Sequence, residues 1–495
     1  MPSQQAAASA AQADRSQAVS AVNALLPERS GAGLSSPSVP QLQQGLLDAA
    51  TSVRNGGAGR GGLGDGSPGG GGAPRSTVMG PQSWLPNSED DLHGDAALLA
   101  AAEPLLAQSD VGRKALLPPT FNRAAYNPAI LHVRFTEAQG KTTGTGNDAF
   151  LDLTLIPLSG EPEGRRVEVS RKAFADDLRQ LYRQLSRQES LQVDNPRSPS
   201  RRLYDQLFAS IAPLLQQKRI TTLLISADRG LQAVPFAALH DGQEYFGTAY
   251  AFALTPSLAL TSLEPPLPNN GRLLAAGSAV FDGLAPLPLV PTELQEVGRN
   301  ERKDVALNRA FTPSTLLEQA ADPRYSRVHV ATHAEFLPGG PAASRMYSGT
   351  VPIPLSEFVK LRKARQGAPL DLISFSACRT ALGDADTELG FAGLALQAGA
   401  RSAVGSLWYV DDVATSAYFV QMYRYLDAGI PKAEALQLTR QAFSRGLVRL
   451  DGERVLGPDN AVLLPSLTTA QQRRVADGLA NPYFWAGIEL LGAAW

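Results

Sequence analysis

The chain has 495 residues, and its 45 Lys and Arg nearly balance its 47 Asp and Glu, giving a formal net charge of −2. This balance excludes a global field that would recruit nucleic acid or an acidic membrane, so we expect neither as a partner. A hydrophobic share of 43% with 19% charged residues is typical of a soluble globular protein. The single cysteine, Cys378, excludes an intrachain disulfide and a Cys-based zinc cage.

The first 125 residues differ in composition from the remainder. Residues 1–90 are rich in Gly, Ala and Ser and are predicted to form a disordered arm. The Gly tract of this arm, Arg54–Arg75, is not predicted to be a phosphate loop, because it lacks the flanking strand and helix that such a loop needs. Residues 91–125 are predicted to be a linker with a short helix at Asp95–Leu106. The N-terminus carries no targeting pattern and no apolar run is long enough for a membrane span, so we expect a cytoplasmic protein.

Residues 126–220 are predicted to form a hairpin and helices that pack as an extra layer. Ala129–Gln139 and Ala149–Gly160 alternate apolar and polar residues around a turn-rich segment, which is the pattern of a hairpin. Phe174–Leu185 and Leu203–Leu215 space their apolar residues by three and four, as amphipathic helices do.

Residues 221–495 alternate short apolar strands with helical segments and are predicted to be the catalytic core. The expected strands are Thr222–Ser226, Tyr250–Leu254, Arg272–Ala276, Arg327–Ala331, Leu370–Phe375 and Ser402–Leu407. The expected helices are Thr292–Asn300, Thr312–Gln319, Leu355–Arg362, Glu388–Gln397, Ala414–Leu426 and Pro431–Arg445. This alternation predicts an α/β fold in which a mostly parallel sheet has helices on both faces.

Two reactive side chains directly follow predicted buried strands. His333 follows one strand in RVHVATHAEF, and Cys378 follows another in LDLISFSACRTALG. If these strands are neighbours, both side chains lie at the sheet edge where open α/β proteins bind ligands. A free thiol has a pKa of about 8.5, so a nearby imidazole would be needed to activate it. The alternative is that Cys378 is a small buried hydrophobe and that His333 is structural.

From about Ile220 to its end, the chain resembles the CHAT domain, a caspase-like domain related to separase. The resemblance rests on motifs in the expected order, which are ISADRGLQAVPFAALHDG, RVHVATHAEF, LDLISFSACRTALGD, ELGFAGLALQAGARSAVGSLWYVDDVAT and NPYFWAGIELLG. It implies a caspase-like three-layer sandwich and a cysteine endopeptidase with the dyad His333 and Cys378. Backbone N–H groups of Ala334 and Cys378 would hold the oxyanion. The family typically has Gly after the His, and Ala334 keeps the same N–H.

The resemblance also suggests a substrate pocket at GSLWYVDDVAT. Asp412 matches the acidic residue that receives a basic side chain in separase, with Asp411 beside it. A desolvated carboxylate would select Arg over Lys, because a guanidinium binds it through two parallel hydrogen bonds. The alternative is that both aspartates cap the helix beginning near Val413.

These interpretations predict a protein or peptide substrate and no cofactor or metal. Metal binding by the HxxxH pair His329 and His333 is not expected, because the pair lies on a predicted strand without a third ligand. An activating protein partner is possible, as is self-processing at the basic run Arg362, Lys363 and Arg365. The alternative function is a catalytically silent interaction or regulatory module, and acyl transfer at the same cysteine stays open.

Overall fold

The computed structural model describes most of the chain beyond residue 126. The described residues are 127–137, 147–157, 161–228, 231–255, 261, 271–335, 345–349, 351–354, 357–358, 360–366, 368, 370–377, 395–396, 398–408 and 411–495. The predicted arm (1–90), the predicted linker (91–125), Cys378 and most of the predicted helix Glu388–Gln397 lie outside these residues.

One large sheet runs through the described part of the chain and has eleven strands there. From edge to edge they are β3 (Glu163–Val169), β2 (Ala149–Pro157), β1 (Pro128–Glu137), β4 (Thr222–Ala227), β5 (Ala251–Thr255), β17 (Ile488–Gly492), β13 (Ala400–Ser406), β12 (Leu370–Ser376), β8 (Tyr325–Ala331), β6 (Arg272–Gly277) and β7 (Lys303–Leu307). Neighbours are parallel except for β1–β2, β2–β3 and β13–β17. The sheet therefore contains two parallel blocks of opposite direction that meet at β13 and β17.

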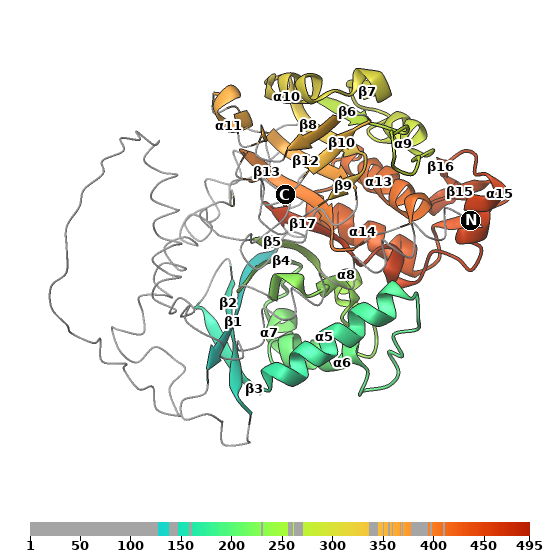
Figure 1. The fold of residues 1–495 in the computed structure, drawn as a ribbon. Helices are drawn as coiled ribbons and strands as arrows, with labels where there is room; N and C mark the ends of the chain where they lie inside the picture. The colour runs from blue at the N-terminus through green and yellow to red at the C-terminus, as the bar shows by residue number, and fades with distance from the viewer. Residues whose placement is uncertain are drawn as a thin grey trace, which may run out of the picture.

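The N-terminal hairpin extends this sheet and does not form the extra layer that we expected. β1 pairs in parallel with β4, from Pro128 opposite Thr222 to Val133 opposite Ala227. The first half of β1 is buried, with Ile130, Leu131 and Val133 at 0% exposure. Apolar side chains on both faces of a strand favour a place inside a sheet, and this is why β1 lies between β2 and β4 (Figure 1).

Helices cover the block that contains β8, β12 and β13 on both faces. α9 (Val290–Glu296) connects β6 to β7, and α10 (Pro313–Ala321) returns from β7 to β8. The two connections run in opposite directions along the sheet, so right-handed crossovers place the two helices on opposite faces. α13 (Asp412–Asp427) contacts α9 and α14 (Lys432–Ser444), and α11 (Lys360–Ala364) contacts α10 (Figure 1). The predicted three-layer α/β class is confirmed.

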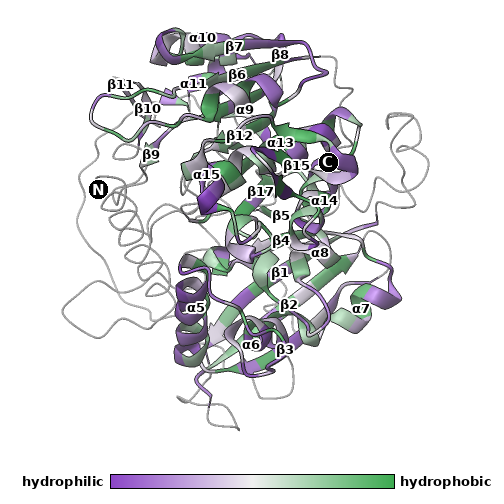
Figure 2. Cartoon of the chain, turned by 90° about the vertical axis from the view of Figure 1, so that its right-hand side faces the viewer, coloured by the Kyte–Doolittle hydropathy of each residue, from purple (hydrophilic) through white to green (hydrophobic). Residues whose placement is uncertain are grey.

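The helices of the N-terminal block are α5 (Arg171–Ser186), α6 (Pro199–Tyr204) and α7 (Ala212–Gln217). α5 begins after Ser170, whose side chain accepts a hydrogen bond from the Ala173 N–H. It buries an apolar stripe, and its exposed hydrophilic side is visible in Figure 2. The single helix predicted at Leu203–Leu215 is wrong, because a π-helical turn at Asp205–Ala209 and a new start before Pro213 divide it.

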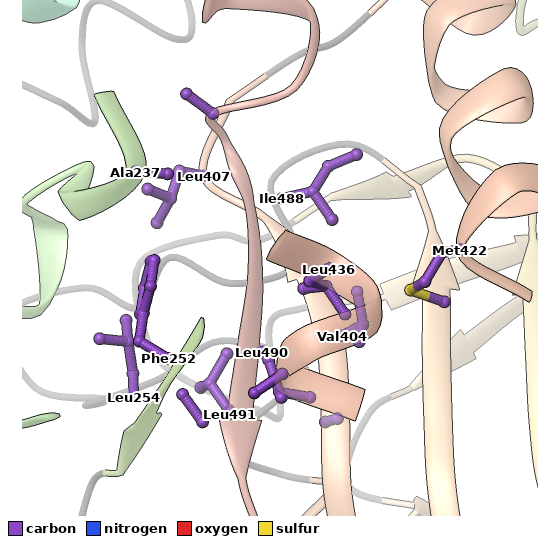
Figure 3. Packing of buried hydrophobic residues seen from close by; sticks show 14 of the residues in the cluster. Ala237, Phe252, Leu254, Val404, Leu407, Met422, Leu436, Ile488, Leu490 and Leu491 are labelled. Carbon is purple, nitrogen blue, oxygen red and sulfur yellow. The ribbon is translucent and has the colours of Figure 1, made fainter. Parts of the chain in front are cut away.

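The core surrounds β17, which we did not predict from the sequence. Leu490 and Leu491 of this strand lie among side chains of β5 and β13, including Phe252 and Val404 (Figure 3). Gly487 precedes the strand, and a Cβ there would lie 2.5 Å from the indole of Trp408. The close approach therefore requires glycine at this position of the NPYFWAGIELLG motif.

Two small sheets complete the described fold. One comprises β9 (Ala334–Glu335), β10 (Arg345–Ser348) and β11 (Val351–Pro354), and the other β14 (Arg449–Asp451), β15 (Arg454–Leu456) and β16 (Val462–Leu464). The first lies in the connection from β8 to β12, where we had predicted only a helix at Leu355–Arg362. Within the described ranges, every helix is too short or too polar to span a bilayer.

Candidate active site

A pocket opens at the edge of the sheet where β8, β12 and β13 end. Its lining residues come from the α9 region, these strand ends, the start of α13 and the start of β17. They are Leu287, Leu289, Val290, Glu293, Thr332, His333, Phe375, Ser376, Ala377, Ser406, Asp412, Thr415, Ser416, Phe419 and Ile488. The cavity volume of about 50 Å³ is several times what one water molecule needs. The pocket thus brings together His333, Asp412 and the residue before Cys378.

The two predicted strands are neighbours, which places the segments that carry His333 and Cys378 at one edge. β8 and β12 pair in parallel with Ala331 opposite Ser376. The pairing continues beyond the strands, because the Thr332 N–H donates to the Ser376 carbonyl at 3.4 Å. Ser406 at the end of β13 donates its hydroxyl to the Ala377 carbonyl at 2.9 Å. The peptide before Cys378 is therefore held from both neighbouring strands.

The His333 ring is oriented by a backbone carbonyl. Its Nε2 lies 2.8 Å from the carbonyl oxygen of Ala285, and its ring packs against Phe281 at 4.6 Å between centroids. A carbonyl can only accept, so Nε2 must carry the proton. In the neutral imidazole, Nδ1 then has the lone pair that a general base requires. The segment between β6 and α9 thus fixes the tautomer, a contribution that the sequence did not reveal.

The Ala334 N–H points away from the small sheet. The Tyr347 N–H donates to the His333 carbonyl at 3.0 Å, and Ala334 is opposite Met346 in the antiparallel β9–β10 pair. In such a ladder hydrogen-bonded and non-hydrogen-bonded pairs alternate, so the Ala334 N–H is directed out of the ladder. Ala334 lies in a strand, and an alanine adopts that conformation without strain.

The two aspartates of the predicted substrate pocket have different places. Asp411 is the N-cap of α13, where Oδ1 accepts the N–H of Val413 at 2.9 Å and that of Ala414 at 3.3 Å. Asp412 is the first residue of the helix and lines the pocket, with 22% of its side chain exposed. Of the two readings, capping therefore describes Asp411, and a pocket position describes Asp412.

One guanidinium serves both carboxylates. Arg474 contacts Asp412 through Nη2, and its Nε lies 2.8 Å from Oδ2 of Asp411. Burial, and next the charge of Asp411, raise the pKa of Asp412, Arg474 opposes them, and the net result is a pKa of about 6. Burial also raises the pKa of Asp411, against Arg474 and the capping N–H groups. The pair is therefore incompletely stabilised as two anions.

Sequence reasoning missed a second carboxylate in the pocket, that of Glu293 on α9. Glu293 is only 2% exposed. Its Oε1 lies 2.9 Å from Nε2 of His329, and its Oε2 accepts the Ser416 hydroxyl at 2.6 Å. These contacts link α9 to β8 and α13, and they identify His329 as a hydrogen-bonding partner of a carboxylate. No group of His, Cys, Asp and Glu among the described residues is arranged to hold a metal ion.

The basic run at the end of α11 is divided between surface and interior. Arg365 is buried at 2% exposure and donates to the carbonyls of Ala320, Asp322 and Tyr325 at 2.7, 3.1 and 3.0 Å. Arg362 and Lys363 are exposed. Arg365 therefore holds the C-terminal end of α10 and is inaccessible as a cleavage site, which removes it from the predicted self-processing run.

Fold and site define an α/β protein with a mostly parallel sheet, covered by helices, and a polar pocket where β8, β12 and β13 end. The family model described as CHAT domain matches residues 197–493, so the chain belongs to the CHAT domain family. A comparison with curated protein sequences found no match.

Comparison with solved structures finds proteins with similar folds. The separase of Saccharomyces cerevisiae, in complex with securin, is 11% identical with a TM-score of 0.43, over 82% of this chain and 31% of the separase chain. The Arg specific cysteine proteinase gingipain R is 11% identical with a TM-score of 0.37, over 58% of this chain and 68% of that one. The chain thus spans about a third of the separase and about two thirds of the gingipain.

Proposed function

We propose that the protein is a cysteine endopeptidase in which Cys378 is the nucleophile and His333 is the general base, and that it cleaves after a basic residue. The observation that carries the proposal is the hydrogen bond from His333 Nε2 to the Ala285 carbonyl, at the rim of a pocket that Ala377 also lines. It supports an imidazole held in the tautomer that accepts a proton on Nδ1. Cys378 follows Ala377 directly in the chain.

In the proposed reaction, His333 takes the thiol proton and the thiolate of Cys378 attacks the scissile carbonyl. The tetrahedral oxyanion is held by the N–H groups of Ala334 and Cys378. Collapse forms a thioester and expels the amine, which takes the proton from the His333 imidazolium; water then hydrolyses the thioester with His333 again as base. Every step uses groups of this chain, the substrate and water.

Asp412 is the proposed carboxylate for the basic side chain of the substrate. Its support is its position in the pocket that also contains His333, and its side chain is partly exposed. A cation entering the pocket would also offset the cost of holding two ionised aspartates side by side.

The test compares the wild-type chain with Cys378→Ala on fluorogenic peptides that end in Arg, on matched citrulline peptides and on a peptide library. Citrulline is the matched control because it has the shape of arginine without the charge. We expect cleavage after Arg by the wild type only. If the wild type cleaves no peptide and a thiol-specific probe does not label Cys378, the peptidase proposal is wrong.

A further inference from the structure

The carboxylate of Glu293 lines the pocket and has more hydrogen-bond acceptor capacity than its two contacts within the fold use. Its carboxylate accepts one hydrogen bond on each oxygen, from His329 and from Ser416. A carboxylate oxygen has two lone-pair sites, so each retains acceptor capacity. Because Glu293 lines the pocket while almost fully buried, a ligand that reaches the pocket's interior meets an acceptor in a region of low dielectric constant.

The distance between Glu293 and Asp412 follows from α13. Asp412 and Ser416 are four residues apart on this helix, so they share a face with their Cβ atoms about 5–6 Å apart. Both line the pocket, and Ser416 donates to Glu293 at 2.6 Å. The Glu293 carboxylate therefore lies about one helical turn along α13 from Asp412, and at 2% exposure, against 22% for the Asp412 side chain, it is the more buried of the two. Two carboxylates at this separation are suited to a planar cation between them that donates in two directions.

Apart from the two carboxylates, His333 is the single ionisable side chain among the described residues that line the pocket, and the other polar side chains there carry hydroxyl groups. Thr415, Ser416 and Ser406 contribute hydroxyl groups. A guanidinium has five N–H donors in a fixed plane, whereas an ammonium has three around one nitrogen. An ammonium that pairs with Asp412 leaves the deeper acceptor unused, and a guanidinium can engage both.

We propose that Glu293 is a specificity-determining residue which, with Asp412, forms a two-carboxylate site for the guanidinium of an arginine side chain. The inference rests on the proposed function, because the bound arginine is taken to be the residue after which the substrate is cut. Asp412 holds the cation near the mouth, and Glu293 receives the far side of the guanidinium. Arginine is therefore selected over lysine by the second carboxylate.

Equilibrium binding tests this without requiring turnover. Fluorescent peptides that end in Arg or Lys are titrated, by fluorescence polarisation, against the Cys378→Ala chain with and without Glu293→Gln. We expect Glu293→Gln to weaken binding of the Arg peptide roughly tenfold and binding of the Lys peptide much less, since one hydrogen bond to a charged group is lost. The matched control is Glu296→Gln, on the same helix but outside the pocket lining. An unchanged preference for Arg over Lys in Glu293→Gln overturns the inference.

A second variant keeps the test valid if Glu293→Gln perturbs folding. Glu293→Asp keeps the charge but withdraws the carboxylate by one methylene, so a peptide ending in homoarginine should recover part of the binding that the Arg peptide loses. If Glu293 only supported the fold, the substitution would weaken binding of both peptides equally, and that result also overturns the inference.

The two proposals fail in different ways. If Glu293→Gln weakens binding of the Arg peptide but the wild type cuts nothing, the guanidinium site stands and the peptidase proposal falls. If the wild type cuts after Arg and Glu293→Gln leaves the Arg-to-Lys ratio of kcat/KM unchanged, the peptidase stands and the role of Glu293 falls. If the Arg peptide does not bind to the Cys378→Ala chain, the guanidinium site is wrong.

Discussion

The ionisation of Asp412 predicts how the preference for a basic substrate depends on pH. Burial and the neighbouring Asp411 raise the pKa of Asp412 to about 6, and only the ionised carboxylate attracts a cation. Because the pKa is raised, the attractive form is present above pH 6 and is lost as the pH falls below it. The ionised fraction falls roughly tenfold between about pH 7 and about pH 5, and the kcat/KM advantage of a basic substrate should fall with it.

The assay is the ratio of kcat/KM for an Arg peptide to that for its citrulline isostere, measured from pH 5 to 8. The titration of His333 and Cys378 affects both peptides and cancels in the ratio. The ratio should rise with a midpoint near pH 6 in the wild type and be flat in Asp412→Asn. Arg474→Gln removes the cation that lowers the pKa of Asp412, so its midpoint should move above pH 6. A ratio that is independent of pH in the wild type, or one that rises equally in Asp412→Asn, refutes the reasoning.

Three further predictions concern stability, measured by urea unfolding. Asp411→Ala removes the cap of α13 and should cost about 1 kcal/mol, whereas Asp411→Asn, which can still cap, should cost less; equal losses would contradict the capping role. Burial raises the pKa of Glu489 from 4.5 to about 8. The stability that this group contributes is therefore complete below pH 4.5 and decreases steadily as the pH rises to 8. Relative to Glu489→Gln, the wild type should lose about 1.4 kcal/mol per pH unit in this window, and a constant difference would contradict the raised pKa. Arg365→Met removes a guanidinium that donates to four carbonyls and should cost about 2–4 kcal/mol, while exposed Lys363→Met should change stability by less than about 0.5 kcal/mol; similar losses would contradict the buried role of Arg365.

The strands of the core could be predicted because they are apolar on both faces. β8 and β12 were expected within two residues of their observed ends. Their adjacency was left open by the sequence, and in the structure they pair in parallel. β7 was missed because its sequence, KDVAL, begins with two charged residues and has only three apolar ones, as an edge strand of the sheet can. β17 was missed because Glu489 interrupts its apolar run; its charge partner Arg440 is 49 residues away, and such pairing is invisible to local patterns.

Two of the residues that the motifs singled out, His333 and Asp412, line one pocket, and their roles there stay predictions. Glu293 looked like an ordinary acidic residue near the start of a helix, because its partners His329 and Ser416 are 36 and 123 residues away in sequence. His240, in the turn-like segment LHDG, is likewise buried at 5% exposure, and its Nδ1 accepts the N–H of Gly242 at 2.9 Å.

The charges around the pocket are arranged at an energetic cost that the fold alone does not require. A helix start needs one capping carboxylate, and Asp411 supplies it, yet Asp412 adds a second one that burial and repulsion disfavour. Arg474 is shared between them and lies outside the pocket lining, and the described residues of the lining include no guanidinium or ammonium group. Carboxylates held in this way are typical of sites where an incoming cation completes the charge balance. This charge distribution therefore supports the proposed binding of a cationic side chain in the pocket.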